Sequence, residues 1–155
     1  MNKSHILTEI IASLRAELHT CLQAARATAA AATDPDSKAE NKYDTRSLEA
    51  SYLARGQAQR VAELQEDLSA FEALGLRSFE PGDVISVGAL VTLKSADHES
   101  YYFFGPAAGG TEILSEGCEV MVFTRSSPLG QRLAGRKVGD VVTLPMGQAR
   151  VCAMC

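Results

Sequence analysis

The chain has 155 residues, of which 46% are hydrophobic and 22% are charged, and its formal net charge is −4. This length and composition are ordinary for one soluble globular domain or for two small ones. The negative charge, with no basic block, argues against a protein that binds nucleic acid by neutralising phosphates.

A first helix is predicted from about Ser4, as its N-cap, to about Ala32. Its apolar positions alternate in steps of four and three, the spacing of a coiled-coil seam. The seam residues are Leu7, Ile11, Leu14, Leu18, Cys21, Ala25 and Thr28. The last turns are nearly all alanine, the best helix former, so the helix should persist with little side-chain bulk.

The pair Asp34-Pro35 should end this helix, because proline disfavours a helical residue before it. A second helix then runs to about Leu74, with Gly75 as its stop. Gly56 inside it costs about 1 kcal/mol relative to alanine, which predicts a local weakness or close packing there. The 3-4 spacing recurs in this helix at Ala50, Ala54, Gln57, Val61, Leu64, Leu68 and Phe71.

Two such helices joined by a short connection should form an antiparallel coiled-coil hairpin over residues 1–76. Its tip, residues 33–44, carries a group of carboxylates from Asp34, Asp36, Glu40 and Asp44.

Residues 80–155 are predicted to form a small antiparallel β domain with one short helix, so that the whole chain is α+β. The helix is expected over Ser126–Arg136, with Ser126 or Ser127 as its N-cap and Pro128 in its first turn. About five strands are expected from alternating β-branched and apolar residues. They are Val84–Leu93, 99–106, 118–124, 138–145 and 148–154.

The four cysteines are scattered, which suits reduced thiols in the cytoplasm better than a disulfide framework. Cys152 and Cys155 form a C-x-x-C pair, but it lacks a second pair for zinc and a helix N-terminus for redox chemistry. No apolar run approaches the roughly 20 residues that span a membrane, and no signal peptide is visible. We therefore expect a cytoplasmic protein without membrane contact.

One string carries a family resemblance: S-P-L-G-Q-R-L-A-G-R-K-V-G-D-V-V, from Ser127 to Val142. It resembles the signature of the Gre transcript-cleavage factors of bacterial RNA polymerase at every defined position. The strand G-A-L-V-T-L, from Gly88 to Leu93, is similar to the family's G-x-x-V-x-L, and E-N-K-Y at Glu40 resembles its E-N-x-x-Y with one residue fewer.

The resemblance implies a C-terminal domain similar to FK506-binding proteins that docks on the polymerase through Ser127, Pro128 and Leu129. It implies that the hairpin enters the secondary channel, where Asp36 and Glu40 hold a Mg²⁺ ion jointly with the polymerase. The factor would have no cofactor of its own, would not be an enzyme alone, and would contact nucleic acid only indirectly. Its function would be to stimulate cleavage of backtracked RNA.

The tip departs from the family pattern D-x-x-E-N, because the residue three before Glu40 is Ser37 and the nearest acid is Asp36, four before. In a helix both spacings place the two carboxylates on one face, but in a tight turn they could point apart. An alternative is therefore a regulator that occupies the channel without stimulating cleavage. A third possibility, a prolyl isomerase or peptide binder, is disfavoured because the β domain offers few aromatic pocket residues beyond 101–104.

Overall fold

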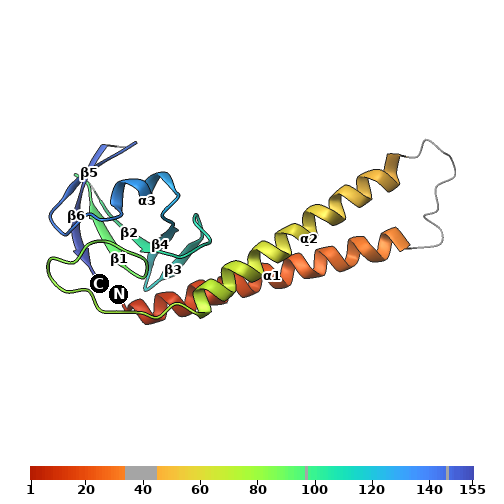
Figure 1. Cartoon of the computed structure of the whole chain (residues 1–155), viewed down its shortest axis with the longest axis horizontal. Coiled ribbons are helices and arrows are strands. Elements are labelled where there is room, and N and C mark those ends of the chain that lie inside the picture. The colour runs from red at the N-terminus through yellow and green to blue at the C-terminus, as the bar shows by residue number, and fades with distance from the viewer. Residues whose placement is uncertain (34–44, 97, 146) are drawn as a thin grey trace. The chain divides into compact units, whose positions relative to one another are not determined.

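The structure is a computed structural model that describes residues 1–33, 45–96, 98–145 and 147–155. Within these ranges the chain forms three helices and six strands (Figure 1). It divides into two compact units, Leu14–Leu68 and a second unit that combines Met1–Ser13 with Ser69–Cys155. The predicted tip carboxylates at 34, 36, 40 and 44 lie outside the described residues.

The unit Leu14–Leu68 is an antiparallel pair of helices, made from α1 (Lys3–Thr33) and α2 (Thr45–Glu72) (Figure 1). Leu14 and Leu64 are fully buried between them. The other described residues of the predicted seam in this unit are partly buried, namely Leu18, Cys21, Ala25 and Thr28 of α1 and Ala54, Gln57, Val61 and Leu68 of α2. The 3-4 spacing therefore predicted the buried side of this pair correctly.

The first turns of α1 bury a different stripe from the predicted one. Ile6 and Ile10 are fully inaccessible, whereas Leu7 and Ile11 are only partly buried. The physical reason is that residues 1–13 belong to the unit that contains the sheet, so this part of the helix does not follow the coiled-coil seam.

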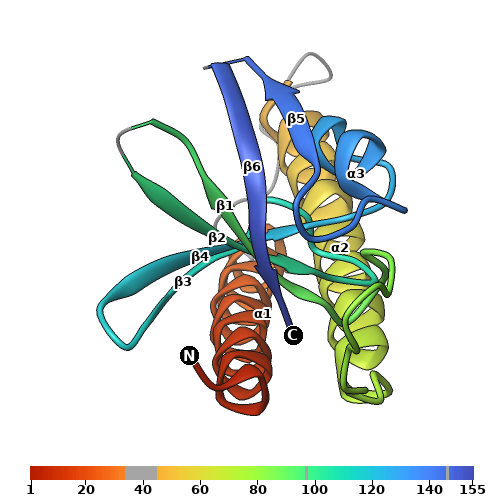
Figure 2. The same cartoon turned by 90° about the vertical axis from the view of Figure 1, so that its left-hand side faces the viewer.

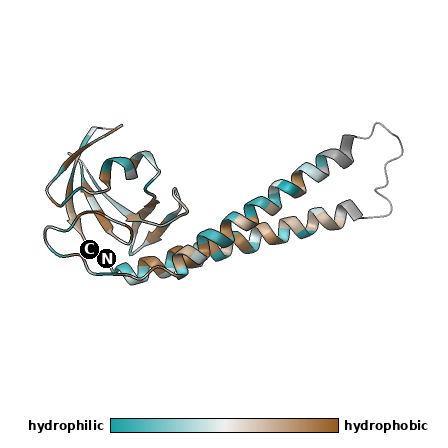
Figure 3. Cartoon of the chain, in the orientation of Figure 1, coloured by the Kyte–Doolittle hydropathy of each residue, from teal (hydrophilic) through white to brown (hydrophobic). Residues whose placement is uncertain are grey.

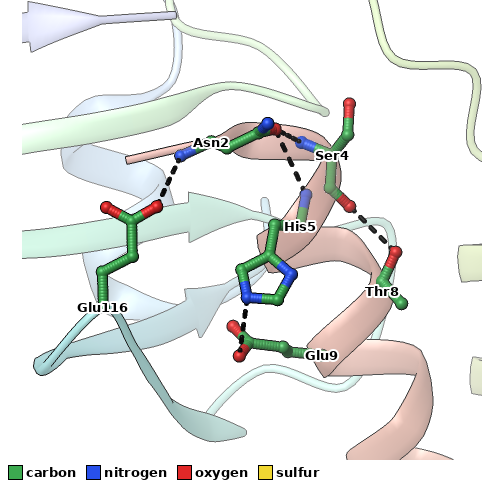
Figure 4. A network of polar contacts seen from close by, with 6 residues as sticks. All are labelled: Asn2, Ser4, His5, Thr8, Glu9 and Glu116. Atoms are coloured by element: carbon green, nitrogen blue, oxygen red, sulfur yellow. Dashed lines mark hydrogen bonds and ion pairs between the residues drawn. The ribbon is translucent and has the colours of Figure 1, made fainter.

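The N-cap of α1 is Asn2, not Ser4 as predicted. Its Oδ1 accepts hydrogen bonds from the backbone N–H groups of Ser4 at 2.9 Å and His5 at 3.3 Å (Figure 4). The backbone N–H of Asn2 in turn donates to Glu116, whose carboxylate also lies 3.7 Å from the amino group of Met1. The start of α1 is thus fixed to the turn that carries Glu116.

The second unit contains one six-stranded sheet in the order β3-β4-β2-β1-β6-β5 (Figure 2). The strands are β1 (Leu90–Lys94), β2 (Glu99–Phe104), β3 (Glu112–Ser115), β4 (Cys118–Phe123), β5 (Val141–Leu144) and β6 (Gly147–Met154). Every neighbouring pair is antiparallel except β2 and β4, which run parallel.

Two features of this sheet differ from the prediction of about five antiparallel strands. The short strand β3 was missed, and it lies at the edge of the sheet. A tight turn at Glu116 and Gly117, both with positive φ, then returns the chain as β4 between β3 and β2. Two consecutive residues of positive φ are typical of a two-residue hairpin turn. Strand β3 runs opposite to β2. Because the chain reverses again at this turn, β4 runs parallel to β2.

The predicted strand Val84–Leu93 is a strand only from Leu90 onward. Gly88 has a φ of +89° and its N–H donates to the carbonyl of Phe104 at 2.8 Å, so the chain turns before β1 begins. Ahead of the turn, Ile85 exchanges hydrogen bonds with residues 135 and 136. Ile85 is buried in the hydrophobic core, so its apolar character reflects burial rather than continuous β-structure, which periodicity alone does not distinguish.

The consecutive residues Phe103 and Phe104 of β2 pack on opposite faces of the sheet, because side chains alternate along a strand. Phe103 of β2 packs with Phe71 of α2, with ring centres 6.3 Å apart. Phe104 stacks on Phe123 of β4 at 4.5 Å, in the core cluster that also includes Leu133 of α3 (Pro128–Leu133). Each buried side chain of this size stabilises the fold by roughly 1.5–3 kcal/mol.

Figure 3 shows polar and apolar residues interspersed along both long helices. Among the described residues, neither these helices nor α3 combine the length and apolar character that crossing a bilayer would require.

Candidate docking surface

The string from Ser127 to Val142 forms α3 and the turn that follows it. Ser127 is the N-cap: its Oγ accepts a hydrogen bond from the N–H of Gly130 at 3.0 Å and donates to the carbonyl of Thr124 at 2.8 Å. Pro128 occupies the first helical turn, where its missing N–H leaves no helical hydrogen bond unmade. The prediction of a helix capped here is confirmed, although the helix ends at Leu133 and is shorter than predicted.

Gly130 and Leu133 hold α3 against the rest of the unit. A Cβ atom placed on Gly130 would lie 1.8 Å from the carbonyl oxygen of Thr124, so no larger residue fits without a shift of the backbone. Leu133 is fully buried in the core cluster. The helix is short, and this close approach fixes where its first turn lies.

The end of the string is shaped by backbone geometry. Gly135 and Gly139 have φ values of +80° and +98°, which glycine adopts at no steric cost. The N–H of Gly135 donates to the carbonyl of Ile85, and Asp140 Oδ2 accepts a hydrogen bond from the N–H of Lys137 at 3.0 Å. The residues G-R-K-V-G-D therefore build the turn into β5.

Two residues of the string are not explained by folding alone. Pro128 is exposed, and Leu129 is partly buried at the margin of the core cluster. Both line an apolar groove of about 410 Å³ beside α3, with Ser127 at its edge. Its other walls come from four places in the chain: Gly109 and Gly110, the residues Met121, Val122 and Phe123 of β4, Arg132 of α3, and Leu144 and Pro145 at the end of β5.

The three predicted docking residues thus line one groove, with Pro128 exposed, Leu129 partly buried and Ser127 capping the helix. The hydroxyl of Ser127 is used by the helix cap, which makes it a residue that positions the other two. Sequence reasoning missed the groove walls at Gly109, Gly110 and Met121. The alternation in C-E-V-M-V-F places Met121 opposite the buried valines, but does not show that a groove lies there.

The predicted metal-binding pair, Asp36 and Glu40, lies outside the described residues. Within the residues that the structure does describe, no three His, Cys, Asp or Glu side chains come together as a metal site. The four cysteines are free thiols. Cys152 lies on β6, at a shift in its register with β1, and Cys155 follows just beyond the end of the strand; both are exposed.

A cross-helix ion pair joins α1 and α2 in the hairpin unit. The guanidinium of Arg60 on α2 contacts the carboxylate of Glu17 on α1, and Arg60 also lies 3.7 Å from Glu63. The hydrogen bond to Glu17 is the main cause of a raised pKa of Arg60. All three groups are about half exposed, so the pair fixes register more than it adds stability.

Neither the protein-family models nor the curated proteins include a match to this sequence. Among solved structures, the chain is similar to the GreA factor homolog 1 (Gfh1) protein of Thermus thermophilus, with 21% identity, a TM-score of 0.40 and 94% of each chain covered. It is also similar to Gfh1 of Thermus aquaticus, with 22% identity, a TM-score of 0.39, and 92% of this chain and 91% of that chain covered. Values this low do not assign a function.

Proposed function

We propose that this chain is a secondary-channel factor of bacterial RNA polymerase. Its sheet-containing unit docks on the polymerase, and its helical hairpin enters the channel that leads to the catalytic centre. The observation that carries the proposal is the string Ser127–Val142. Its serine, glycines, buried leucine and aspartate each have a folding role, while the exposed Pro128 and the partly buried Leu129 line an apolar groove.

The hairpin supports the same proposal through its construction. The last described turns of α1 carry almost only small residues, in the string A-A-R-A-T-A-A-A-A-T. Small side chains on α1 let the partner helix approach closely, which narrows the pair and suits entry into a confined passage.

The tip residues would supply the chemistry. Carboxylates are the ligands that Mg²⁺ prefers, and Mg²⁺ often takes only one or two of them from a protein while water and phosphate complete its shell. Asp36 and Glu40 fit this donor chemistry, and would hold the ion jointly with the polymerase. A second metal ion of this kind orients and activates a water for phosphodiester hydrolysis. The chain would then have no cofactor and no catalytic activity by itself.

The second candidate function is a regulator that occupies the channel without stimulating cleavage. The observation that favours it is the spacing at the tip, where Ser37 stands three residues before Glu40 and the nearest acid, Asp36, stands four before. If the chain turns tightly there, the two carboxylates point apart and no metal is held.

Binding and channel entry can be tested together with core RNA polymerase from the organism that carries the gene. Equilibrium binding of the full chain is measured, and a photo-crosslinking residue placed at Ser37 reports what the tip contacts. The proposal predicts binding and crosslinks to polymerase segments around the catalytic centre. Crosslinks confined to the outer surface of the polymerase, or no binding, would contradict it.

A further inference from the structure

A second cavity opens in the sheet where two hairpins diverge. The parallel strands β2 and β4 pair only over Tyr101–Phe104 and Val120–Phe123. Before that ladder, the β1–β2 hairpin and the β3–β4 hairpin separate towards their tips (Figure 2). The cleft between them has a volume of about 380 Å³.

The cleft is acidic and aromatic. Glu99, Glu112 and Glu119 line it together with Tyr101 and Tyr102. Glu99 lies 3.7 Å from Lys94, whereas in the described part of the chain Glu112 and Glu119 have no basic partner. Two carboxylates without a counter-charge on one face leave a negative potential that an external cation can neutralise.

The face that carries these carboxylates also exposes apolar side chains. Glu112, Met121 and Tyr102 are register partners across β3, β4 and β2, and Leu114 pairs with Glu119 in the next row. Leu114 is 68% exposed and Met121 is 37% exposed. Exposed apolar side chains grouped on one sheet face mark a surface that another protein can cover.

Met121 joins this cleft to the docking groove, because it lines both cavities. The two cavities therefore form one continuous surface that begins at Pro128 and Leu129, crosses Met121, and ends between Glu112 and Glu119. Its apolar part lies at α3 and its acidic part at the diverging hairpins.

We propose that the acidic cleft is the specificity-determining half of the polymerase-docking surface and receives a lysine or arginine side chain from the polymerase. The proposal rests on the proposed function. It identifies the partner element as an amphipathic segment that presents apolar side chains to the groove and, next to them, at least one basic side chain to the cleft.

The chemistry of the cleft suits such a side chain. The aliphatic stem of a lysine or arginine packs against Met121 and the Tyr102 ring, and its charged head reaches Glu112 and Glu119. The arginine of the chain on this surface, Arg132, lies at the other end, among the walls of the groove, and no lysine or arginine lines the cleft in the described part of the chain. Charge complementarity therefore fixes which end of a basic amphipathic segment meets which end of the surface.

The test is equilibrium binding of the full chain to core RNA polymerase, measured at low and at high ionic strength. The variant is Glu112→Lys/Glu119→Lys, and Glu112→Gln/Glu119→Gln removes the charge with little change of shape. The control is Glu80→Lys, which alters an exposed acid of the same unit outside the cleft.

We expect the Lys variant to bind roughly tenfold more weakly at low ionic strength, the Gln variant to lose less, and both losses to shrink as salt is added. The Glu80→Lys variant should bind nearly as the unchanged protein does. Equal binding by all four proteins would overturn the role of the cleft and leave the proposed function standing. No binding by the unchanged protein would overturn both.

A folding defect is distinguished by thermal unfolding of the same proteins. Glu112 and Glu119 are exposed on strands, so we expect their melting temperatures to stay close to that of the unchanged chain. Loss of binding by both the Lys variant and the Glu80→Lys control would show a general effect of net charge and would overturn the proposal.

Discussion

The carbonyl oxygen of Thr124 occupies the space where a side chain at Gly130 would begin, since a Cβ atom there would lie 1.8 Å away. This contact places the first turn of α3 directly on the backbone that precedes it. We expect Gly130→Ala to lower the free energy of unfolding by about 3 kcal/mol, because the clash is with backbone that has little room to move. Differential scanning calorimetry of both proteins measures the change.

Gly56→Ala is the matched control, and we expect the opposite sign. Gly56 is exposed on α2, and a Cβ atom there would meet nothing within 4 Å. The alanine should raise the stability of the hairpin unit by up to about 1 kcal/mol through helix propensity alone. Of the two sequence-based expectations for Gly56, a local weakness and close packing, the open space around it supports the weakness. A destabilised Gly56→Ala protein would contradict this account.

The Ser127 hydroxyl should be replaceable only by another hydroxyl. Ser127→Ala removes both the cap to Gly130 and the donation to Thr124, and should cost about 1 kcal/mol. Ser127→Thr keeps an acceptor and a donor and should remain close to the unchanged protein. Urea unfolding distinguishes them, and equal stability of the alanine and threonine variants would show that the cap contributes nothing.

Pro128→Glu separates docking from folding. Pro128 is exposed at the start of α3, where an acidic residue is also favourable, so stability should stay nearly constant. Binding to RNA polymerase should weaken by roughly tenfold or more, because a charge then faces the apolar groove. Unchanged affinity of a folded Pro128→Glu protein would remove this residue from the docking surface.

The stability of the sheet-containing unit should depend on pH through Lys3. Its Nζ donates to the carbonyl of Arg77 at 2.6 Å and lies 4.8 Å from the centre of the Phe79 ring. Burial is the main reason that its pKa is lowered from 10.5, with a smaller lowering from Arg77 and an opposing contribution from Cys155.

Because the folded state then binds fewer protons than the unfolded state, the Lys3 contribution to stability rises with pH between the lowered pKa and 10.5. Urea unfolding of the unchanged protein and of Lys3→Met, at a series of pH values up to 10.5, isolates this contribution. As the pH rises between the lowered pKa of Lys3 and 10.5, the unfolding free energy of the unchanged protein should increase relative to that of Lys3→Met. Parallel pH profiles of the two proteins would contradict the assignment.

Features set by local sequence were predictable, and those set by long-range packing were not. The seam from Leu14 to Thr28 follows from spacing, and the cap at Ser127 follows from residue type. The stripe at Ile6 and Ile10 did not follow, because residues 1–13 bury their side chains in the other unit. Likewise, β3 is a four-residue edge strand whose order in the sheet depends on where the chain reverses at Glu116.

The docking surface was predictable only in part, because most of its walls are brought together by long-range packing. Ser127, Pro128 and Leu129 are consecutive and share a recognisable string. The groove and the acidic cleft are assembled from α3 and from residues of four strands, β2, β3, β4 and β5. A single sequence gives no indication that β2 and β4 run parallel, or that they are apart at their starts and pair only further along. The cleft therefore appears only in the folded chain.

The most direct test of the proposed action on the polymerase uses stalled, backtracked elongation complexes with labelled RNA. The full chain is added, and separately its Asp36→Ala/Glu40→Ala variant, with binding of both proteins measured in parallel. The account predicts faster cleavage of the RNA 3′ end by the unchanged protein, and loss of that acceleration in a variant that still binds. Binding of the unchanged protein without faster cleavage would contradict it and would identify a regulator that only occupies the channel.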